Sequence, residues 1–327
     1  MVNPSPHPLP AGDPPVAPRG EPDDLTTSMR LGREARPRTW RSVAGDYLLL
    51  TKPFIVALLL MTTLSAMLIA ARGMPPWPVF IFTLIGGACA SGGANAFNSW
   101  YDRNLDKQMD RTARRPIPSG RVPARSALVF SLVLCVLSQI LLGFFVNWLA
   151  ALLALAGIIY YAVLYTTALK YMTPQNIVVG GGAGAIPPLV GWAAATGEIN
   201  LLALYLFAII FLWTPPHTWA LMLLIEKDYR SARVPMMPAI WGGAETRWQA
   251  LLYTVLLFVV TLLPYTFLAL GNFYLVCAVL LGGWLLFLAF RLWRDGEKST
   301  ARRLYKYSNY YLALLFLAMV IDAAVIR

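Results

Sequence analysis

Nine long blocks of apolar residues constrain the fold of this chain more than any other feature of its sequence. A helix needs about 20 apolar residues to cross the hydrocarbon core of a bilayer. Backbone groups in lipid must hydrogen-bond within their own segment, so we expect each block to be a helix. The predicted spans are residues 54–71, 77–98, 126–146, 149–168, 177–195, 201–224, 249–270, 273–290 and 308–326. The sequence therefore predicts an all-α integral membrane protein with nine transmembrane helices.

The distribution of basic residues predicts how these helices are oriented. The formal net charge is +11, although only 13% of the residues are charged. With nine spans, every Lys and Arg except Arg72 and Arg327 falls on one side of the membrane. Basic residues concentrate on cytoplasmic loops, so we expect the N-terminus to lie in the cytoplasm. The basicity is explained by topology in a lipid bilayer, and no nucleic-acid partner is expected.

Residues 1–45 differ from the rest of the chain. They are rich in Pro, carry charges of both signs and have no apolar periodicity. Such a segment cannot bury enough apolar surface to order itself. We predict a disordered, Pro-rich cytoplasmic tail over 1–45 and one polytopic domain over 46–327.

A charged stretch, NSWYDRNLDKQMDRTARRP, follows the second apolar block at residues 98–116. Asn98, Asp102 and Asp106 are four residues apart, a spacing that places side chains on one face of a helix. Each step of four overshoots a full turn by about 40°. Asp110, one step further, is therefore expected to have drifted off the shared face.

Two interpretations of this stretch are open. The structural one is a solvated helix end, in which pairs such as Arg103–Asp106 satisfy the charges. However, Asp102 has no basic residue one turn ahead, and two carboxylates at this spacing repel. A positive group from elsewhere should lie between them. Carboxylates that bind Mg²⁺, followed by the arginines Arg111 and Arg115, would instead form a diphosphate site.

A second polar cluster, EKDYRSARVPMMP, follows the sixth apolar block at residues 226–238. It contains Lys227 and Asp228, and nine spans place it on the same side of the membrane as the first cluster. Two facing acidic clusters could hold two Mg²⁺ ions on one diphosphate. Taken alone, this segment could equally be a membrane-surface loop with mixed charges.

These residues resemble a known family. The pattern Asn98-x3-Asp102-x3-Asp106, followed by Arg111 and Arg115-Pro116, is similar to the first aspartate motif of the UbiA superfamily of intramembrane prenyltransferases. Lys52-Pro53 resembles the basic-proline opening of that superfamily. Three stretches, TPQNIVVGGGAGAIPPLVGW (173–192), WTPPHTWAL (213–221) and DYRSARVPMMP (228–238), resemble the branch that farnesylates haem.

The resemblance implies helices around a central cavity and an Mg²⁺-dependent enzyme. It implies transfer of a farnesyl group from farnesyl diphosphate to a vinyl group of haem B, giving haem O. The implied catalytic and metal-binding residues are Asn98, Asp102, Asp106 and Asp228. The implied diphosphate-binding residues are Arg111, Arg115, Lys170, Lys52 and Lys227. The implied location is a prokaryotic plasma membrane, with the site towards the cytoplasm and a downstream haem-modifying or oxidase-assembly protein as a further partner.

His217 is the only histidine outside the tail, and it follows Pro215-Pro216 in the sixth block. Since haem iron commonly takes a histidine ligand, we expect His217 to bind haem. It could instead be a hydrogen-bonding helix residue or a proton acceptor. Aromatic residues such as Tyr161 and Tyr165 could stabilise an allylic cation, or simply pack.

The chain departs from the resemblance at three places. Phe54 stands where a basic residue often follows the Lys-Pro pair. Tyr171-Met172 stand where two arginines often follow the lysine, and Lys227 stands in place of an aspartate before Asp228. Two rival functions remain: prenylation of an aromatic quinone or chlorophyll precursor, and transport of an anion by a protein that is no enzyme.

Overall fold

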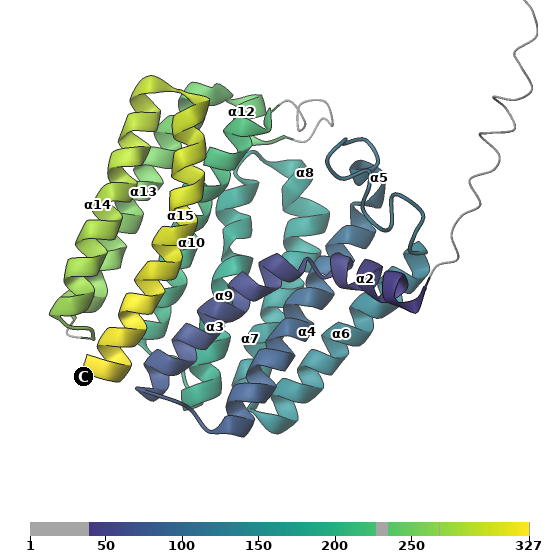
Figure 1. The fold of residues 1–327 in the computed structure, drawn as a ribbon, viewed down its shortest axis with the longest axis horizontal. Helices are drawn as coiled ribbons and strands as arrows, with labels where there is room; N and C mark the ends of the chain where they lie inside the picture. The colour runs from purple at the N-terminus through teal and green to yellow at the C-terminus, as the bar shows by residue number, and fades with distance from the viewer. Residues whose placement is uncertain (1–38, 227–234, 268, 327) are drawn as a thin grey trace, which may run out of the picture. The chain divides into compact units, whose positions relative to one another are not determined.

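The structure, a computed structural model, describes residues 39–226, 235–267 and 269–326 (Figure 1). All regular secondary structure in these ranges is helical. The elements are α2 (Trp40–Leu50), α3 (Pro53–Ala71), α4 (Trp77–Tyr101), α5 (Arg103–Asp106), α6 (Ala124–Phe145), α7 (Trp148–Ile159), η1 (Tyr160–Leu169), α8 (Lys170–Met172), α9 (Asn176–Thr196), α10 (Leu201–Leu224), α12 (Met237–Ile240), α13 (Gly242–Thr266), α14 (Asn272–Asp295), α15 (Lys298–Ile321) and η2 (Asp322–Ile326).

Nine helical segments of the described chain are long and apolar enough to cross a membrane, which confirms the predicted fold class. The fourth span, Trp148–Met172, is composed of α7, the π-helix η1 and α8. The ninth runs from Lys298 to Ala324, so it begins ten residues before the predicted block. Its first turns carry the charged residues Arg302, Arg303 and Lys306, so they do not belong to a continuous block of apolar residues.

Local capping explains several helix ends. The Oδ1 atoms of Asn147 and Asn200 accept hydrogen bonds from backbone N–H groups of the first turns of α7 and α10, at 2.8 and 3.1 Å. A side-chain oxygen at this position satisfies a donor that the helix leaves free.

Lys52, between α2 and α3, adopts a left-handed conformation with φ 54°. This backbone is costly for a residue other than glycine, and such residues concentrate at functional sites.

Glycines allow the central helices to pack closely. A Cβ atom at Gly191 of α9 would lie 2.2 Å from the backbone oxygen of Thr63 in α3, so only glycine fits this crossing. Small residues of this kind are typical of close helix contacts in membranes. α9 also packs against α7 and α10, whereas α13, α14 and α15 pack together at the C-terminal side of the bundle (Figure 1). The helices α3, α4, η1, α9 and α10 thus surround the centre of the domain.

The predicted tail cannot be compared as a whole, because residues 1–38 lie outside the described residues. α2 nevertheless begins at Trp40, so helical structure starts within the stretch that the sequence assigns to the tail. Asp46 lies in the second half of α2, and its carboxylate accepts a hydrogen bond from Arg121 at 2.8 Å. Asp46 is 7% exposed, and this ion pair ties α2 to the segment that follows the aspartates.

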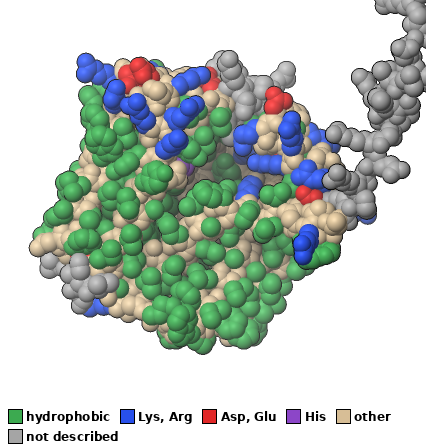
Figure 2. Space-filling model, viewed as in Figure 1, with side chains coloured by type: hydrophobic (Ala, Val, Ile, Leu, Met, Phe, Trp, Pro, Cys, Tyr) green, Lys and Arg blue, Asp and Glu red, His purple; other side chains and the backbone are tan. Residues whose placement is uncertain are grey.

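Charged and apolar side chains are separated on the surface. On the face shown in Figure 2, Lys and Arg gather mainly at one end of the bundle, and apolar side chains cover most of the remainder. The surface is hollowed near the charged end, with basic side chains on both sides of the hollow. This separation is typical of a membrane protein with one strongly basic face.

Candidate active site

Three predicted site residues lie together at the end of α4. Asn98, Asp102 and Asp106 are 5%, 4% and 4% exposed, whereas Asp110 is exposed. The backbone N–H groups of Asp102 and Asp106 bond to the carbonyls four residues earlier, at 2.9 and 2.8 Å. Helical geometry therefore continues from α4 through α5 and buries one face. The three side chains share this buried face, and Asp110 lies outside it.

Asp102 is held by three donors. Its Oδ2 accepts hydrogen bonds from Lys170 Nζ at 2.6 Å and from Asn98 Nδ2 at 2.9 Å. Its Oδ1 accepts one from the hydroxyl of Tyr171 at 3.0 Å. The positive group expected beside Asp102 is therefore Lys170, from the fourth span. In the sequence, Tyr171 stands out only because it replaces an arginine that is frequent in the family, and its contact with Asp102 was not predicted.

Asp106 is held by Arg115 from the following loop. The Nη1 atom of Arg115 donates to Oδ1 of Asp106 at 2.9 Å and to Oδ2 at 2.8 Å. The intrahelical alternative is not formed, since the guanidinium of Arg103 donates instead to the carbonyl of Trp100. Thr112 fixes the loop, because its hydroxyl donates to the backbone oxygen of Asp106 at 3.0 Å. Both Asp102 and Asp106 are thus paired with a cation from outside α4 and α5.

Lys52 is the third cation of the cluster. Its Nζ donates to Asn98 Oδ1 at 2.7 Å. Burial lowers the pKa of Lys52 to about 7, and the positive charge of Arg115 acts in the same direction. The left-handed turn at this residue directs the chain from α2 into α3 and brings the side chain to the aspartates.

The π-helix η1 positions the side of the site contributed by the fourth span. The hydroxyl of Thr166 donates to the carbonyl of Tyr161, five residues earlier, and accepts from Asn98 Nδ2 at 3.2 Å. π-Helical turns are rare and frequently occur at functional sites. η1 ends at Leu169, directly before Lys170, so its wide turns set where Lys170 and Tyr171 meet Asp102.

A cavity of about 300 Å³, lined by several charged residues, adjoins Asp106. Lys52, Asp106, Arg111 and Arg115 are among its lining residues, together with Arg114. Arg111 is exposed and reaches this cavity rather than the carboxylates themselves. The structure therefore brings together Lys52, Lys170 and Arg115, with Arg111 at the adjoining cavity.

The second polar cluster lies largely outside the described residues, which include neither Lys227 nor Asp228. Met236 and Met237, near the C-terminal end of this cluster, are described. They pack in one buried group of residues with Met109, which lies between Asp106 and Asp110. The loop after the sixth span therefore contacts the segment that carries the first aspartates. The roles of Lys227 and Asp228 stay predictions.

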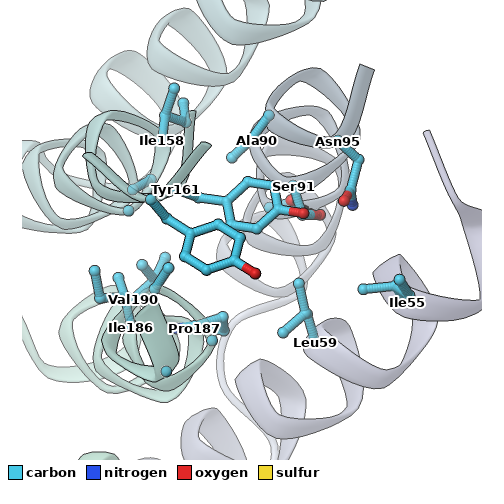
Figure 3. A pocket seen from close by; sticks show the side chains of 18 of the residues that line it. Ile55, Leu59, Ala90, Ser91, Asn95, Ile158, Tyr161, Ile186, Pro187 and Val190 are labelled. Carbon is cyan, nitrogen blue, oxygen red and sulfur yellow. Dashed lines mark hydrogen bonds between the residues drawn. The ribbon is translucent and has the colours of Figure 1, made fainter. Parts of the chain in front are cut away.

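A second, mainly apolar cavity of about 380 Å³ lies among α3, α4, η1, α9 and α10. Figure 3 shows Tyr161 projecting into it from η1, with Leu59 of α3 and Pro187 of α9 on other sides. The rings of Tyr161 and Tyr165 stack with centroids 5.6 Å apart, and both line the cavity. This is the central cavity that the resemblance implies.

Glycines of α9 form one wall of this apolar cavity. Gly180, Gly181 and Gly184 line it, and a Cβ atom at Gly180 would lie 2.3 Å from the ring of Tyr165. Glycine at this position therefore leaves room for the tyrosine. α9 remains helical through Pro187 and Pro188.

His217 lies on α10 and faces α15. Its ring stacks on Trp213 with a centroid distance of 4.2 Å, and its Nδ1 lies 2.7 Å from Ser308 Oγ. The Ser308 hydroxyl donates to the carbonyl of Tyr305, so it accepts from Nδ1–H of the histidine. Nε2 then carries the lone pair. Among the described residues Nε2 has no hydrogen-bond partner, which leaves it available to a ligand.

The oxygen donors fit a hard cation. Each carboxylate offers about four lone-pair positions. Asp102 uses three of them and Asp106 two, so both keep acceptor capacity towards an ion. Mg²⁺ usually binds through one or two carboxylates and keeps other positions for water or phosphate. The described residues contain no group of three His, Cys, Asp or Glu side chains, so any further acidic ligand must come from elsewhere.

The described residues form a bundle with nine helices long and apolar enough to cross a membrane, and paired aspartates and cations lie near an apolar cavity, an arrangement suited to an amphiphile with an anionic head. The chain belongs to the UbiA prenyltransferase family, which it matches over residues 59–319.

Two relatives illustrate the similarity. Protoheme IX farnesyltransferase of Chloroflexus aurantiacus is 53% identical over 287 residues, which cover 88% of this chain and 49% of the relative. Protoheme IX farnesyltransferase of a Synechocystis species is 49% identical over 301 residues, covering 91% of this chain and 95% of the relative. The chain thus spans about half of the first protein and nearly all of the second.

Solved structures share the fold at low sequence identity. A structure described for digeranylgeranylglyceryl phosphate synthase has a TM-score of 0.73 and 20% identity, covering 86% of this chain and 99% of that one. A UbiA homolog from Archaeoglobus fulgidus, bound to GPP and Mg²⁺, has a TM-score of 0.60 and 17% identity, covering 84% and 99%.

Proposed function

We propose that this protein transfers the farnesyl group of farnesyl diphosphate to a vinyl group of haem B, giving haem O. The observation that carries the proposal is the buried cluster of Asn98, Asp102 and Asp106, held by three cations next to an apolar cavity. Relatives that are about 50% identical over the matched residues bear the name protoheme IX farnesyltransferase, which supports this choice of donor and acceptor.

The charges of the cluster suit a diphosphate with a metal ion. Lys170 and Arg115 can turn from the carboxylates, and Lys52 from the amide oxygen of Asn98, to phosphate oxygens, for which an arginine fork is well matched. Asn98, Asp102, Asp106 and Asp228 would hold Mg²⁺. The ion, when bound, would neutralise charge that develops on the leaving oxygens. Arg111 and Lys227 would add positive charge at the entrance.

The apolar cavity suits the farnesyl chain. Along α4, the residues from Asn98 to Gly87 cover about 16 Å at the helical rise of 1.5 Å per residue. A main chain of twelve carbons extends to roughly 15 Å, given single bonds of ~1.5 Å at nearly tetrahedral angles. The stacked rings of Tyr161 and Tyr165 present π faces that stabilise an allylic cation. The apolar walls would also keep water away from that cation.

His217 is the proposed haem ligand. Its tautomer, fixed by Ser308, directs the lone pair to Nε2, and a histidine that binds metal commonly donates its other N–H to a protein acceptor. Thr214 and Thr218 of α10 line the apolar cavity, whereas His217, between them in sequence, faces Ser308 of α15. The alternative role, a proton acceptor, uses the same free nitrogen.

The reaction is balanced by one water molecule. The bond between C1 of farnesyl and oxygen breaks, and diphosphate leaves with the electron pair. The vinyl group then forms a carbon–carbon bond with C1, and the positive charge moves to the carbon next to the porphyrin. Water adds to that carbon and loses a proton, which leaves a hydroxyl group on the product.

The proposed setting follows from the charge distribution. A basic end of the bundle supports an active site towards the cytoplasm in a plasma membrane. The product would pass to a haem-modifying or oxidase-assembly protein.

The test uses purified protein in detergent with haem B, farnesyl diphosphate and Mg²⁺, and follows the haem product by mass spectrometry. We expect hydroxyethylfarnesyl haem, and its loss with EDTA or in Asp102→Ala. Prenylation of an added aromatic acceptor in place of haem would overturn the choice of acceptor. If folded protein in lipid formed neither product, the proposed enzyme activity would be wrong.

A further inference from the structure

Asn95 is a buried polar residue that the proposed site has not yet used. It lies on α4, seven residues before Asp102, and is 3% exposed. Seven residues are close to two helical turns, so Asn95 lies about 10 Å below Asp102 on nearly the same face. It lines the apolar cavity. Its sequence context, an apolar span, gave no reason to single it out.

The side-chain amide of Asn95 has no hydrogen-bond partner among the described residues. Only its backbone carbonyl accepts a bond, from the hydroxyl of Ser99. An amide left unpaired in an apolar environment costs about 1–3 kcal/mol, and most buried amides in proteins are therefore paired. The cavity thus contains an unsatisfied donor and acceptor at a defined position.

A second unpaired group faces the same space. Tyr161 projects from η1 towards the helix that carries Ser91 and Asn95 (Figure 3). Its hydroxyl has no hydrogen-bond partner in the part of the chain that the structure describes. The hydroxyl of Ser91, by contrast, is satisfied by the carbonyl of Gly87 at 2.7 Å. Asn95 and Tyr161 are therefore two groups of this cavity that are free to bind a small polar ligand.

Water is the ligand that this arrangement fits. A buried water molecule typically makes about three hydrogen bonds to polar groups that are otherwise unsatisfied. The amide of Asn95 can both donate and accept, and so can the hydroxyl of Tyr161. The remainder of the wall is mainly apolar, which would restrict solvent to this position.

We propose that Asn95 and Tyr161 bind the water molecule that hydrates the farnesylated vinyl group. This inference rests on the proposed function. After the carbon–carbon bond has formed, the water oxygen attacks the carbon next to the porphyrin, and the proton that it loses passes to the diphosphate released in the first step. Without a held water, the same cation loses a proton from the neighbouring CH₂ group and closes to an alkene. The two outcomes differ in the product by one molecule of water.

The experiment compares Asn95→Leu with the native protein under the assay conditions above and measures the ratio of hydrated to unhydrated farnesyl haem. Leucine is close in shape to asparagine, and removing an unpaired buried amide does not destabilise the fold. We expect the hydrated fraction relative to the alkene to fall by roughly tenfold, as for loss of a hydrogen bond to the reacting water. Tyr161→Phe should shift the ratio in the same direction.

Thr83→Val is the matched control. Thr83 lies on α4, is fully buried, and its hydroxyl has no hydrogen-bond partner in the structure, but it does not line the cavity. Its substitution should leave the product ratio unchanged. A native ratio in both Asn95→Leu and Tyr161→Phe would overturn this inference while leaving the proposed function intact. Absence of any farnesylated haem from the native protein would overturn both.

Discussion

The ion pair between Lys170 and Asp102 gives a sharp test of how the site is held together. Its N–O distance is 2.6 Å, and the two side chains are only 11% and 4% exposed. Removal of one partner from a buried pair typically costs 3–5 kcal/mol, because the other charge stays buried. In Lys170→Met, Asp102 would keep its bonds from Asn98 and Tyr171, so we expect the lower end of that range.

A loss of about 3 kcal/mol corresponds to a fall of roughly 6–12 °C in Tm for a domain of this size class. Thermal unfolding in detergent, without substrate or metal, measures it. Activity should also fall strongly, because Lys170 is a proposed diphosphate ligand. The double variant Lys170→Met/Asp102→Asn removes both charges and should recover most of the lost Tm while remaining inactive.

Arg291→Met is the control, since Arg291 is 51% exposed and lies 3.5 Å from Asp295. An exposed pair contributes about 0.2–1 kcal/mol, so its Tm should move little. The reasoning is refuted if the double variant is no more stable than Lys170→Met, since the cost would then not come from an uncompensated Asp102.

Three further predictions concern the substrate sites. Gly184 faces open space in the apolar cavity, so Gly184→Leu should lower kcat/KM for farnesyl diphosphate and shift the substrate preference to the shorter geranyl diphosphate. Gly283 of α14 faces open space outside that cavity, so the control Gly283→Leu should leave the substrate preference unchanged. Arg115→Gln should raise the KM for farnesyl diphosphate roughly tenfold, as expected for one lost charge-assisted contact, with the KM for haem unchanged; an equal rise in both would contradict a diphosphate role. Tyr171→Phe should lower kcat by less than tenfold, because Asp102 keeps its bonds from Lys170 and Asn98, and a loss as large as that of Asp102→Ala would show that Tyr171 acts directly.

The parts of this structure that could be predicted are those set by period and length. The spans follow from the thickness of the bilayer, and the grouping of Asn98, Asp102 and Asp106 follows from the helical repeat. The repulsion expected between Asp102 and Asp106 also predicted a positive group beside Asp102. Spacing could not identify that group as Lys170, because Lys170 and Asp102 are 68 positions apart and meet through tertiary packing.

Other features depend on geometry that no local pattern reports. The contacts of Thr166 and Tyr171 arise from the wide turns of η1, which look like an ordinary apolar span in the sequence. Asn95 stands in a span of small and apolar residues, and its position only became meaningful once the cavity was seen. The start of α15 was missed because its basic first turns interrupt the apolar pattern.

The central claim is that one bundle holds two separate substrates, the diphosphate at Asp102 and haem at His217. The most direct measurement is therefore equilibrium binding of each substrate to Asp102→Asn and His217→Ala, with farnesyl diphosphate plus Mg²⁺ followed calorimetrically and haem followed by its absorption spectrum. We expect a crossed pattern, in which Asp102→Asn loses diphosphate binding but keeps haem, and His217→Ala does the opposite. A haem spectrum and affinity unchanged in His217→Ala, or loss of both ligands in both variants, would contradict it.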